Sequence, residues 1–248
     1  MEILTELLSL AASYEHELPP SSAEGEIPRG NDLATYIDHT LLKPEATASQ
    51  VKDLCTEAIQ YGFAAVCINP TYVPLARGLL YNSPVSIATV VGFPLGANLP
   101  SYKAYETLAC LDAGATEIDM VLNIGAMKGG VYGQVYNEIQ AVAQVCHNQN
   151  ALVKVILETA LLTYSEKIIA CLICKAAGAD FVKTSTGFGP AGAKIEDVDL
   201  MRRVVGTNLG VKAAGGIRTL SDATAMIRAG ANRLGTSSGV KILQETQA

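Results

Sequence analysis

Residues 151–184 read ALVKVILETALLTYSEKIIACLICKAAGADFVKT, two short β-rich runs on either side of a longer helical pattern. The runs at 152–157 and 181–184 are rich in β-branched and aromatic residues, which favour strands. Between them, residues 165–177 carry apolar side chains at three- and four-residue spacing, and Gly178 follows where a helix would end. This stretch therefore predicts one strand, a crossover helix and a second, parallel strand.

The same alternation continues along most of the chain. Further strands are predicted at 36–38, 64–68, 86–91, 117–122, 211–213 and 233–235, and further helices at 49–61, 102–113, 131–147, 195–205 and 221–229. We expect the helices to end at residues that tolerate a left-handed backbone, namely Gly62, Asn82, Gly114, Asn148 or Asn150, Gly178, Asn208 and Gly230.

About eight such units in 248 residues predict an α/β fold of the (β/α)8 TIM barrel type. A doubly wound open sheet is the rival, but it would need central strands made almost purely of Val, Ile and Leu. We expect a single catalytic barrel domain at residues 33–248. It is preceded by an extension at 1–32 that contains an amphipathic helix at 1–17 and a Pro- and Ser-rich linker at 18–25.

Composition narrows the function classes. The net charge of −6 gives no general basic field for nucleic acid or anionic lipid, so we expect neither as a partner. No apolar stretch approaches the roughly 20 residues that span a bilayer, and the acidic start is unlike a signal peptide. We therefore expect a cytoplasmic protein without membrane contact.

The cysteines and histidines favour chemistry without a metal. The six cysteines lie in apolar segments, which is typical of buried reduced thiols. The pair Cys171 and Cys174 has no second pair or nearby histidine to complete a zinc site, and only His39 of the three histidines follows a strand closely. We predict no metal and no cofactor. The run from Gly187 to Gly192 satisfies G-x-G-x-x-G, but the next strand lacks the acidic residue that would hold a ribose.

Charged residues inside the strands carry the candidate chemistry. Lys154, Lys183 and Lys212 occur in three successive strands, and Asp119 occurs in the strand before them. One such lysine would most simply reach solvent from a strand end, but alternation can turn all four side chains into one barrel. Burial and like charge disfavour protonated lysines, so we expect at least one neutral amine. A neutral amine beside a second cation is suited to Schiff-base formation, with Asp119 and another lysine moving protons.

Glycine and hydroxyl residues follow the last strands and predict a phosphate site. Backbone N–H groups in such loops approach phosphate closely, and barrels often bind phosphate after strands seven and eight. Ordinary tight turns would also explain any one loop. The loops concerned are Thr184 to Gly187, Gly215 to Gly216 and Gly235 to Gly239.

These residues resemble the deoxyribose-phosphate aldolase family, Schiff-base aldolases built on a (β/α) barrel. The resemblance extends from about Tyr36 to Ser238. It rests on YIDHTLLKP at 36–44, VGFPLG at 91–96, EIDMV at 117–121, KVILET at 154–159, FVKTSTG at 181–187, VKAAGGIR at 211–218 and GTSS at 235–238.

The resemblance implies reversible cleavage of 2-deoxy-D-ribose 5-phosphate to acetaldehyde and D-glyceraldehyde 3-phosphate. It implies that Lys183 forms the imine, that Asp119 and Lys212 donate and accept protons while a cationic Lys212 favours a neutral Lys183, and that Lys154 is a supporting charge. It also implies substrate and phosphate contacts at Thr186, Gly187, Gly215, Gly216, Gly235, Ser237 and Ser238. A homodimer or homotetramer would be consistent with such barrels.

Two features depart from many relatives. The loop after the sixth strand contains Pro190 and Lys194 where a run of glycines is common, and the chain does not end in the tyrosine that some members carry. Two other functions stay open. One is another Schiff-base lyase or transaldolase acting on a different sugar phosphate, and the other is a catalytically silent phosphate-binding barrel.

Overall fold

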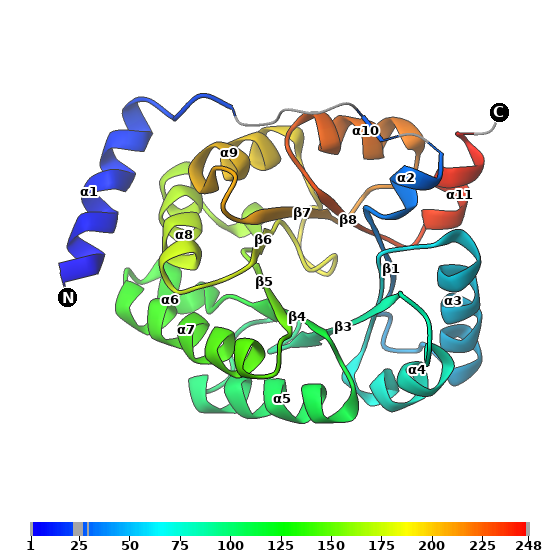
Figure 1. The fold of residues 1–248 in the computed structure, drawn as a ribbon. Helices are drawn as coiled ribbons and strands as arrows, with labels where there is room; N and C mark the ends of the chain where they lie inside the picture. Colours follow the sequence, from blue (N-terminus) through cyan, green and yellow to red (C-terminus); the bar gives the residue numbers. More distant parts are fainter. Residues whose placement is uncertain (1, 22–26, 29, 247–248) are drawn as a thin grey trace.

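A computed structural model describes residues 2–21, 27–28 and 30–246, and within them eight parallel strands close into a barrel in chain order. Figure 1 shows the strands enclosed by a ring of helices. The predicted (β/α)8 barrel is thereby confirmed, and the open sheet is excluded. The strands are β1 (Ile37–Leu41), β2 (Ala65–Ile68), β3 (Ser86–Val91), β4 (Glu117–Val121), β5 (Leu152–Ile156), β6 (Phe181–Lys183), β7 (Gly210–Ala214) and β8 (Arg233–Thr236).

One principal helix follows each strand and covers the outside of the barrel. Thr47, Thr163 and Thr219 begin three of these helices with capping boxes, in which a threonine and the side chain three residues later satisfy the first backbone N–H groups. The helices are α3 (Ala48–Tyr61), α4 (Val73–Leu79), α5 (Pro100–Ala113), α7 (Tyr132–Asn148), α8 (Tyr164–Ala176), α9 (Ile195–Val205), α10 (Leu220–Arg228) and α11 (Gly239–Gln244). The short elements are α2 (Asn31–Ala34), α6 (Ile124–Lys128), η1 (Pro70–Tyr72) and η2 (Thr159–Leu161).

Two predicted features of the helices need correction. The predictions contain no helix at α4, although Pro74 near its start is typical of a first helical turn. Helix α9 has the predicted bounds, but the residue with a positive φ that follows it is Gly206, at 67°, and not the predicted Asn208. Asn150 has the predicted positive φ, 55°, directly after the C-cap of α7, whereas Asn82 also has a positive φ, 64°, but lies three residues beyond the end of α4.

The barrel has an apolar layer outside its strands and a smaller cluster inside. The large core fills the space between strands and helices and includes side chains such as Ile118, Val153 and Val211. The inner cluster consists of Leu42, Ala65, Cys67, Ala88 and Val90, contributed by β2 and β3 and by the loop after β1. The apolar part of the interior is thus confined to one side, and charged side chains occupy the other.

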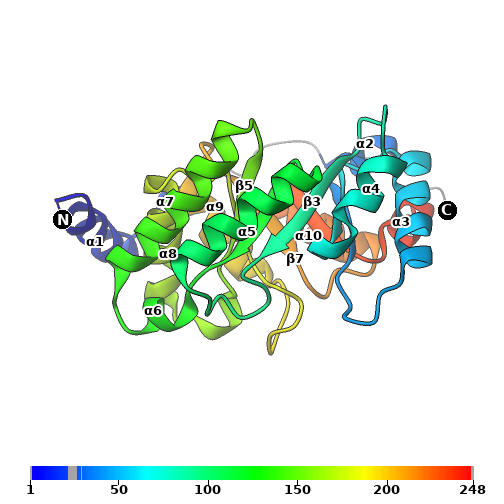
Figure 2. The same cartoon turned by 90° about the horizontal axis from the view of Figure 1, so that it is seen from below.

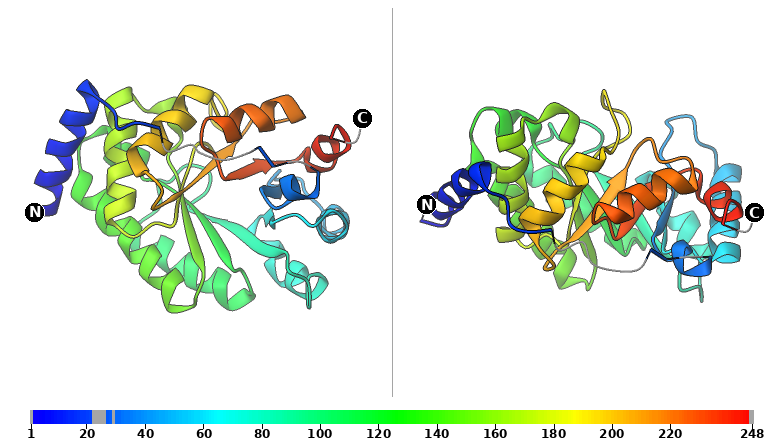
Figure 3. Two further views of the ribbon diagram at one scale, coloured as in Figure 1. Left: turned by 45° about the horizontal axis from the view of Figure 1, so that its top comes forward. Right: turned by 90° about the horizontal axis from the view of Figure 1, so that it is seen from above.

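Helix α1 (Glu2–His16) lies outside the ring and packs against α8, as Figure 3 shows from two directions. Ala11 is buried in this contact, and Arg203 of α9 donates hydrogen bonds to the carbonyl oxygens of Leu18 and Pro19. The predicted helix of the extension is therefore present. Residues 22–26 of the predicted linker lie outside the described residues, and the division at residue 32 stays a prediction.

None of the helices in the described ranges combines the length and the apolar character needed to cross a bilayer.

Candidate functional site

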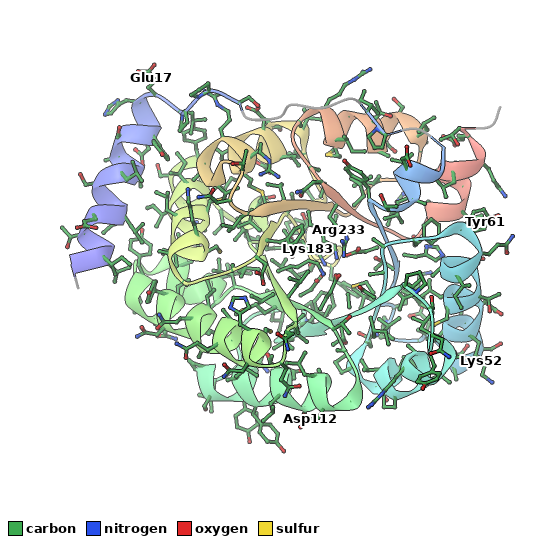
Figure 4. The ribbon with its side chains drawn as sticks, in the orientation of Figure 1. Glu17, Lys52, Tyr61, Asp112, Lys183 and Arg233 are labelled. Atoms are coloured by element: carbon green, nitrogen blue, oxygen red, sulfur yellow. The ribbon has the colours of Figure 1, made fainter. Side chains whose placement is uncertain are left out.

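Strand alternation brings seven charged side chains into the barrel. The register pairs Asp119 with Lys154 and Lys183 with Lys212, so charged residues of neighbouring strands point the same way. Figure 4 labels Lys183 and Arg233 inside the ring of strands. We call the set the charged cluster; it comprises Asp38, Glu117, Asp119, Lys154, Lys183, Lys212 and Arg233.

Asp119 is the centre of this cluster. Its Oδ1 accepts a hydrogen bond from the Nζ of Lys154 at 2.9 Å, and its Oδ2 accepts one each from the Nζ atoms of Lys183 and Lys212 at 2.7 Å. All four side chains are buried, with no more than 2% of any residue exposed. The structure thus brings together the four predicted catalytic residues around one carboxylate.

Two further carboxylates, those of Asp38 and Glu117, pair with cations of the cluster. Asp38 accepts from Lys212 and, at 2.5 Å, from the Nε of Arg233. Glu117 accepts two bonds from the same guanidinium at 2.6 and 2.8 Å, and one of its oxygens lies 2.5 Å from the Nζ of Lys154. Charge-assisted bonds of this kind are stronger than neutral ones.

These carboxylates determine the protonation of two of the three lysines. Burial by itself lowers the pKa of Lys212, but Asp119 and Asp38 more than offset it, and the pKa is raised well above its ordinary value. The pKa of Lys154 is also raised, because Asp119, Glu117 and Asp38 outweigh burial and the repulsion from Lys212. Lys154 and Lys212 are therefore cations near neutral pH.

The same interactions lower the pKa values of the carboxylates. Burial raises the pKa of Asp119, yet Lys154, Lys183 and Lys212 together hold it well below its usual range. Burial likewise raises the pKa of Asp38, but Lys212, Lys154 and Arg233 lower it to about 2. Both carboxylates are thus ionised over the whole physiological range.

A pocket of about 360 Å³ opens at the carboxyl ends of β1, β6, β7 and β8. Among the described residues that line it are Lys183 and six of the seven predicted substrate or phosphate contacts: Thr186, Gly187, Gly215, Gly216, Gly235 and Ser237. Ser238 does not line it; its backbone N–H donates to the hydroxyl of Thr236. Asp119, Lys154 and Lys212 are not among the lining residues either, so Lys183 links the cluster to the pocket.

Close backbone packing explains a glycine of the pocket wall, Gly215, and the glycine packed against it, Gly192. A Cβ on Gly192 would lie 2.2 Å from the carbonyl oxygen of Gly215, and Gly215 itself has a φ of 88°. The N–H of Ala193 donates to the carbonyl oxygens of Ala214 and Gly215. The loop after β6, which carries Pro190 and Lys194, is thus held against the end of β7. Figure 2 shows this loop projecting on the same side as the loop after β1.

Sequence reasoning missed several residues of the site. Asp38, Glu117 and Arg233 complete the charged cluster, and the exposed cations Lys43 and Arg218 line the pocket beside the glycine loops. Alternation was the available signal, because Glu117 is two residues before Asp119 and Arg233 is two residues before Gly235.

The six cysteines are all buried and free of disulfides. Cys171 and Cys174 both lie inside α8, and burial raises the pKa of each thiol. The described residues form no group of three or more His, Cys, Asp or Glu side chains arranged to hold a metal ion. Chemistry without a metal stays a prediction.

Comparison with known proteins places the chain in a family. The sequence model of the DeoC/LacD family aldolases matches residues 33–245. The chain belongs to this family. Within the family, the chain is 57% identical over 215 residues to a deoxyribose-phosphate aldolase of Thermoanaerobacter sp. (strain X514), a match that covers 86% of this chain and 96% of that one. A deoxyribose-phosphate aldolase of Thermococcus gammatolerans is 58% identical over 217 residues, or 87% of this chain and 96% of that one.

Solved structures of the DeoC/LacD type share the fold closely. The deoxyribose phosphate aldolase of Aeropyrum pernix, described as tetrameric, superposes with a TM-score of 0.83 at 37% identity and covers 88% of this chain and 92% of its own. A candidate deoxyribose-phosphate aldolase of Coccidioides immitis superposes with a TM-score of 0.92 at 41% identity and covers 99% of this chain and 98% of its own. The latter match takes in the N-terminal extension.

Proposed function

We propose that this family member is a Schiff-base aldolase that reversibly cleaves 2-deoxy-D-ribose 5-phosphate to D-glyceraldehyde 3-phosphate and acetaldehyde. The observation that carries the proposal is the position of Lys183. It lines the pocket, and its amine is hydrogen-bonded to Asp119 at the top of the charged cluster. The relatives named above carry the same activity in their names.

Charge balance supports a neutral Lys183 during catalysis. The cluster holds four basic side chains, Lys154, Lys183, Lys212 and Arg233, against three carboxylates. A buried cluster is most favourable when its charges cancel, because each unpaired buried charge is costly. Lys154 and Lys212 hold their protons, so Lys183 at the pocket is the amine that can give one up.

The reaction follows from a neutral amine at this point. Lys183 adds to the aldehyde carbon of the open-chain sugar, and loss of water gives an iminium. Removal of the proton from the hydroxyl at C3 breaks the bond between C2 and C3, releases D-glyceraldehyde 3-phosphate and leaves an enamine on Lys183. Protonation of the enamine at C2 and addition of water then release acetaldehyde and restore the amine.

Asp119 and Lys212 are suited to moving these protons. Lys183 and Lys212 donate to the same oxygen of Asp119, so a proton can pass between the two amines through one carboxylate, with water completing the path to the substrate. Lys154, itself paired with Glu117, holds the other oxygen of Asp119, and Asp38 holds Lys212. The pocket-lining glycines and Ser237, together with the cations Lys43 and Arg218, would hold the phosphate, and Ser238 follows in the same loop.

The proposal also covers the cellular compartment, the substrates and the assembly of the enzyme. Six free buried thiols suit the reducing cytoplasm, and a small sugar phosphate and acetaldehyde would be its only substrates. An assembly of two or four copies is part of the proposal and is tested by light scattering on the purified chain.

Borohydride trapping tests the activity. The protein is incubated with 2-deoxyribose 5-phosphate in EDTA under limiting borohydride, and peptide mass spectrometry locates the adduct. We expect an adduct confined to Lys183, and no turnover or adduct in Lys183→Met. An adduct on another lysine would refute the assignment of the nucleophile. A folded protein that forms no adduct would point to a different sugar phosphate, which a panel of phosphorylated sugars would identify, or to a silent barrel.

A further inference from the structure

Glu158 follows β5 and carries two local costs that the charged cluster does not explain. Its backbone has a φ of 53°, in the left-handed region that non-glycine residues rarely adopt. Its carboxylate is 2% exposed, and burying a carboxylate is unfavourable unless it is paired or hydrogen-bonded. Such costs tend to persist where the surrounding structure or the function requires the conformation.

The carboxylate of Glu158 is directed at the loop that leaves Lys183. One oxygen, Oε2, accepts hydrogen bonds from both the hydroxyl and the backbone N–H of Thr186, the latter at 3.3 Å. The other oxygen, Oε1, has no hydrogen-bond partner within the described part of the chain. Within the described residues, Thr186 therefore donates both hydrogen bonds that this buried carboxylate accepts.

The contact continues from Thr186 to the pocket wall. The backbone N–H of Phe188 donates to the hydroxyl oxygen of Thr186 at 3.0 Å, and Thr186, Gly187 and Phe188 all line the pocket. At the next residue, a Cβ on Gly189 would lie only 2.8 Å from the carboxyl carbon of Glu158. Glu158 thus lies directly beneath the turn that forms one wall of the pocket. The ring of Phe188 also packs edge to face against that of Phe93, with 5.3 Å between the ring centroids.

We propose that Glu158 is a positioning residue that acts through Thr186 to hold the wall of the substrate pocket formed by residues 186–188. This inference rests on the proposed function and adds to it a residue that touches neither the charged cluster nor the pocket. The amine of Lys183 is held separately by Asp119, so Glu158 governs how the sugar phosphate is held and leaves imine formation itself intact.

Kinetics with two carbonyl compounds separate these roles. Glu158→Ala should raise the KM for 2-deoxyribose 5-phosphate by about tenfold or more and change kcat by less than about threefold. Trapping of acetaldehyde alone, which is too small to span the pocket, should proceed at the parent rate. The exposed Glu196, at the start of α9, provides the matched control: Glu196→Ala should match the parent in every assay.

A double-mutant cycle tests whether Glu158 acts through Thr186. If it does, Glu158→Ala combined with Thr186→Val should be no worse than Thr186→Val alone. Thr186→Ser, which keeps the hydroxyl, should restore most of the parent KM. If Glu158→Ala does not fold, Glu158→Asp replaces it, since it keeps the charge and shortens the reach by one methylene; its KM should rise in the same way.

The outcomes are distinct for the two proposals. An unchanged KM in a folded Glu158→Ala or Glu158→Asp overturns the positioning role. It is also overturned if the KM of the double variant rises by the product of the two single-variant increases, because the two residues would then act independently. Equal losses in acetaldehyde trapping and in turnover would also overturn it, because they would indicate general disruption of the site. A parent protein that traps neither compound would instead refute the proposed function.

Discussion

Asp38 offers a direct measure of how much the charged cluster stabilises the barrel. The substitution Asp38→Asn removes the charge that faces Lys212 and Arg233 and, at 3.7 Å, Lys154. It keeps the size of the side chain. Any loss of stability therefore reports on charge and hydrogen bonding and not on packing.

The magnitude follows from the pKa of Asp38, which is lowered from 3.8 to about 2 in the folded protein. Each pKa unit corresponds to about 1.4 kcal/mol, so ionisation of Asp38 contributes about 2.5 kcal/mol to the free energy of unfolding at pH 7. Leaving buried cations without their partner costs about 3 to 5 kcal/mol in comparable cases. We expect Asp38→Asn to lower the free energy of unfolding by about 2 to 5 kcal/mol, out of a total of about 5 to 15.

The pH dependence has a definite sign. Because the folded pKa lies below the unfolded one, this contribution is fully present above pH 4 and is lost as the pH falls towards 2. At pH 3 the parent should already have lost about 1 kcal/mol of this stabilisation. The free energies of unfolding of the parent and of Asp38→Asn should therefore differ by about 1 kcal/mol less at pH 3 than at pH 7.

Urea unfolding of both proteins at pH 7 and pH 3 checks this expectation, since urea does not screen charges as a salt would. The exposed Asp53 of α3 gives a control, and Asp53→Asn should leave the midpoint nearly unchanged. A difference between parent and Asp38→Asn that is the same at both pH values would show that the ionisation of Asp38 does not stabilise the fold.

Three further outcomes are expected. Lys183→Met should be at least as stable as the parent in thermal unfolding, because the charged cluster then holds equal numbers of cations and carboxylates, three of each. A much lower thermal midpoint would contradict this. Gly210→Ala should lower the free energy of unfolding by about 1 to 3 kcal/mol, since its Cβ would lie 2.0 Å from the ring of Phe181, and an unchanged urea midpoint would show that the ring can move away. Removal of residues 1–21 should lower the thermal midpoint, because α1 covers α8, without changing kcat; a loss of kcat would assign the extension a role in catalysis.

Much of the barrel could be predicted because its local signals agree with one another. The strand at 86–91 and the helix at 195–205 were predicted with the bounds of β3 and α9, where apolar runs and periodic helices are clearly punctuated. Helix α4 was missed because it has only seven residues and contains Pro74 and Gly78, both of which lower helix propensity.

The candidate site was predictable only in part, and the reason is physical. A lysine in the middle of an apolar strand is unusual by itself, so Lys154, Lys183 and Lys212 could be singled out. Glu117 and Arg233 occur at the first positions of β4 and β8, where a charged residue is ordinary. Their meeting depends on the stagger of strands around the closed barrel, which brings residues 116 positions apart within 2.6 Å.

The same stagger explains why two of the three lysines are cations. With only Asp119 in view, three amines face one carboxylate, and repulsion should neutralise some of them. Asp38 and Glu117 add two carboxylates to the cluster, and they pair with Lys212 and Lys154. Lys183 alone of the three lysines lines the pocket. A barrel interior that holds Lys154 and Lys212 as cations thereby places only the third lysine where a carbonyl substrate can reach its amine.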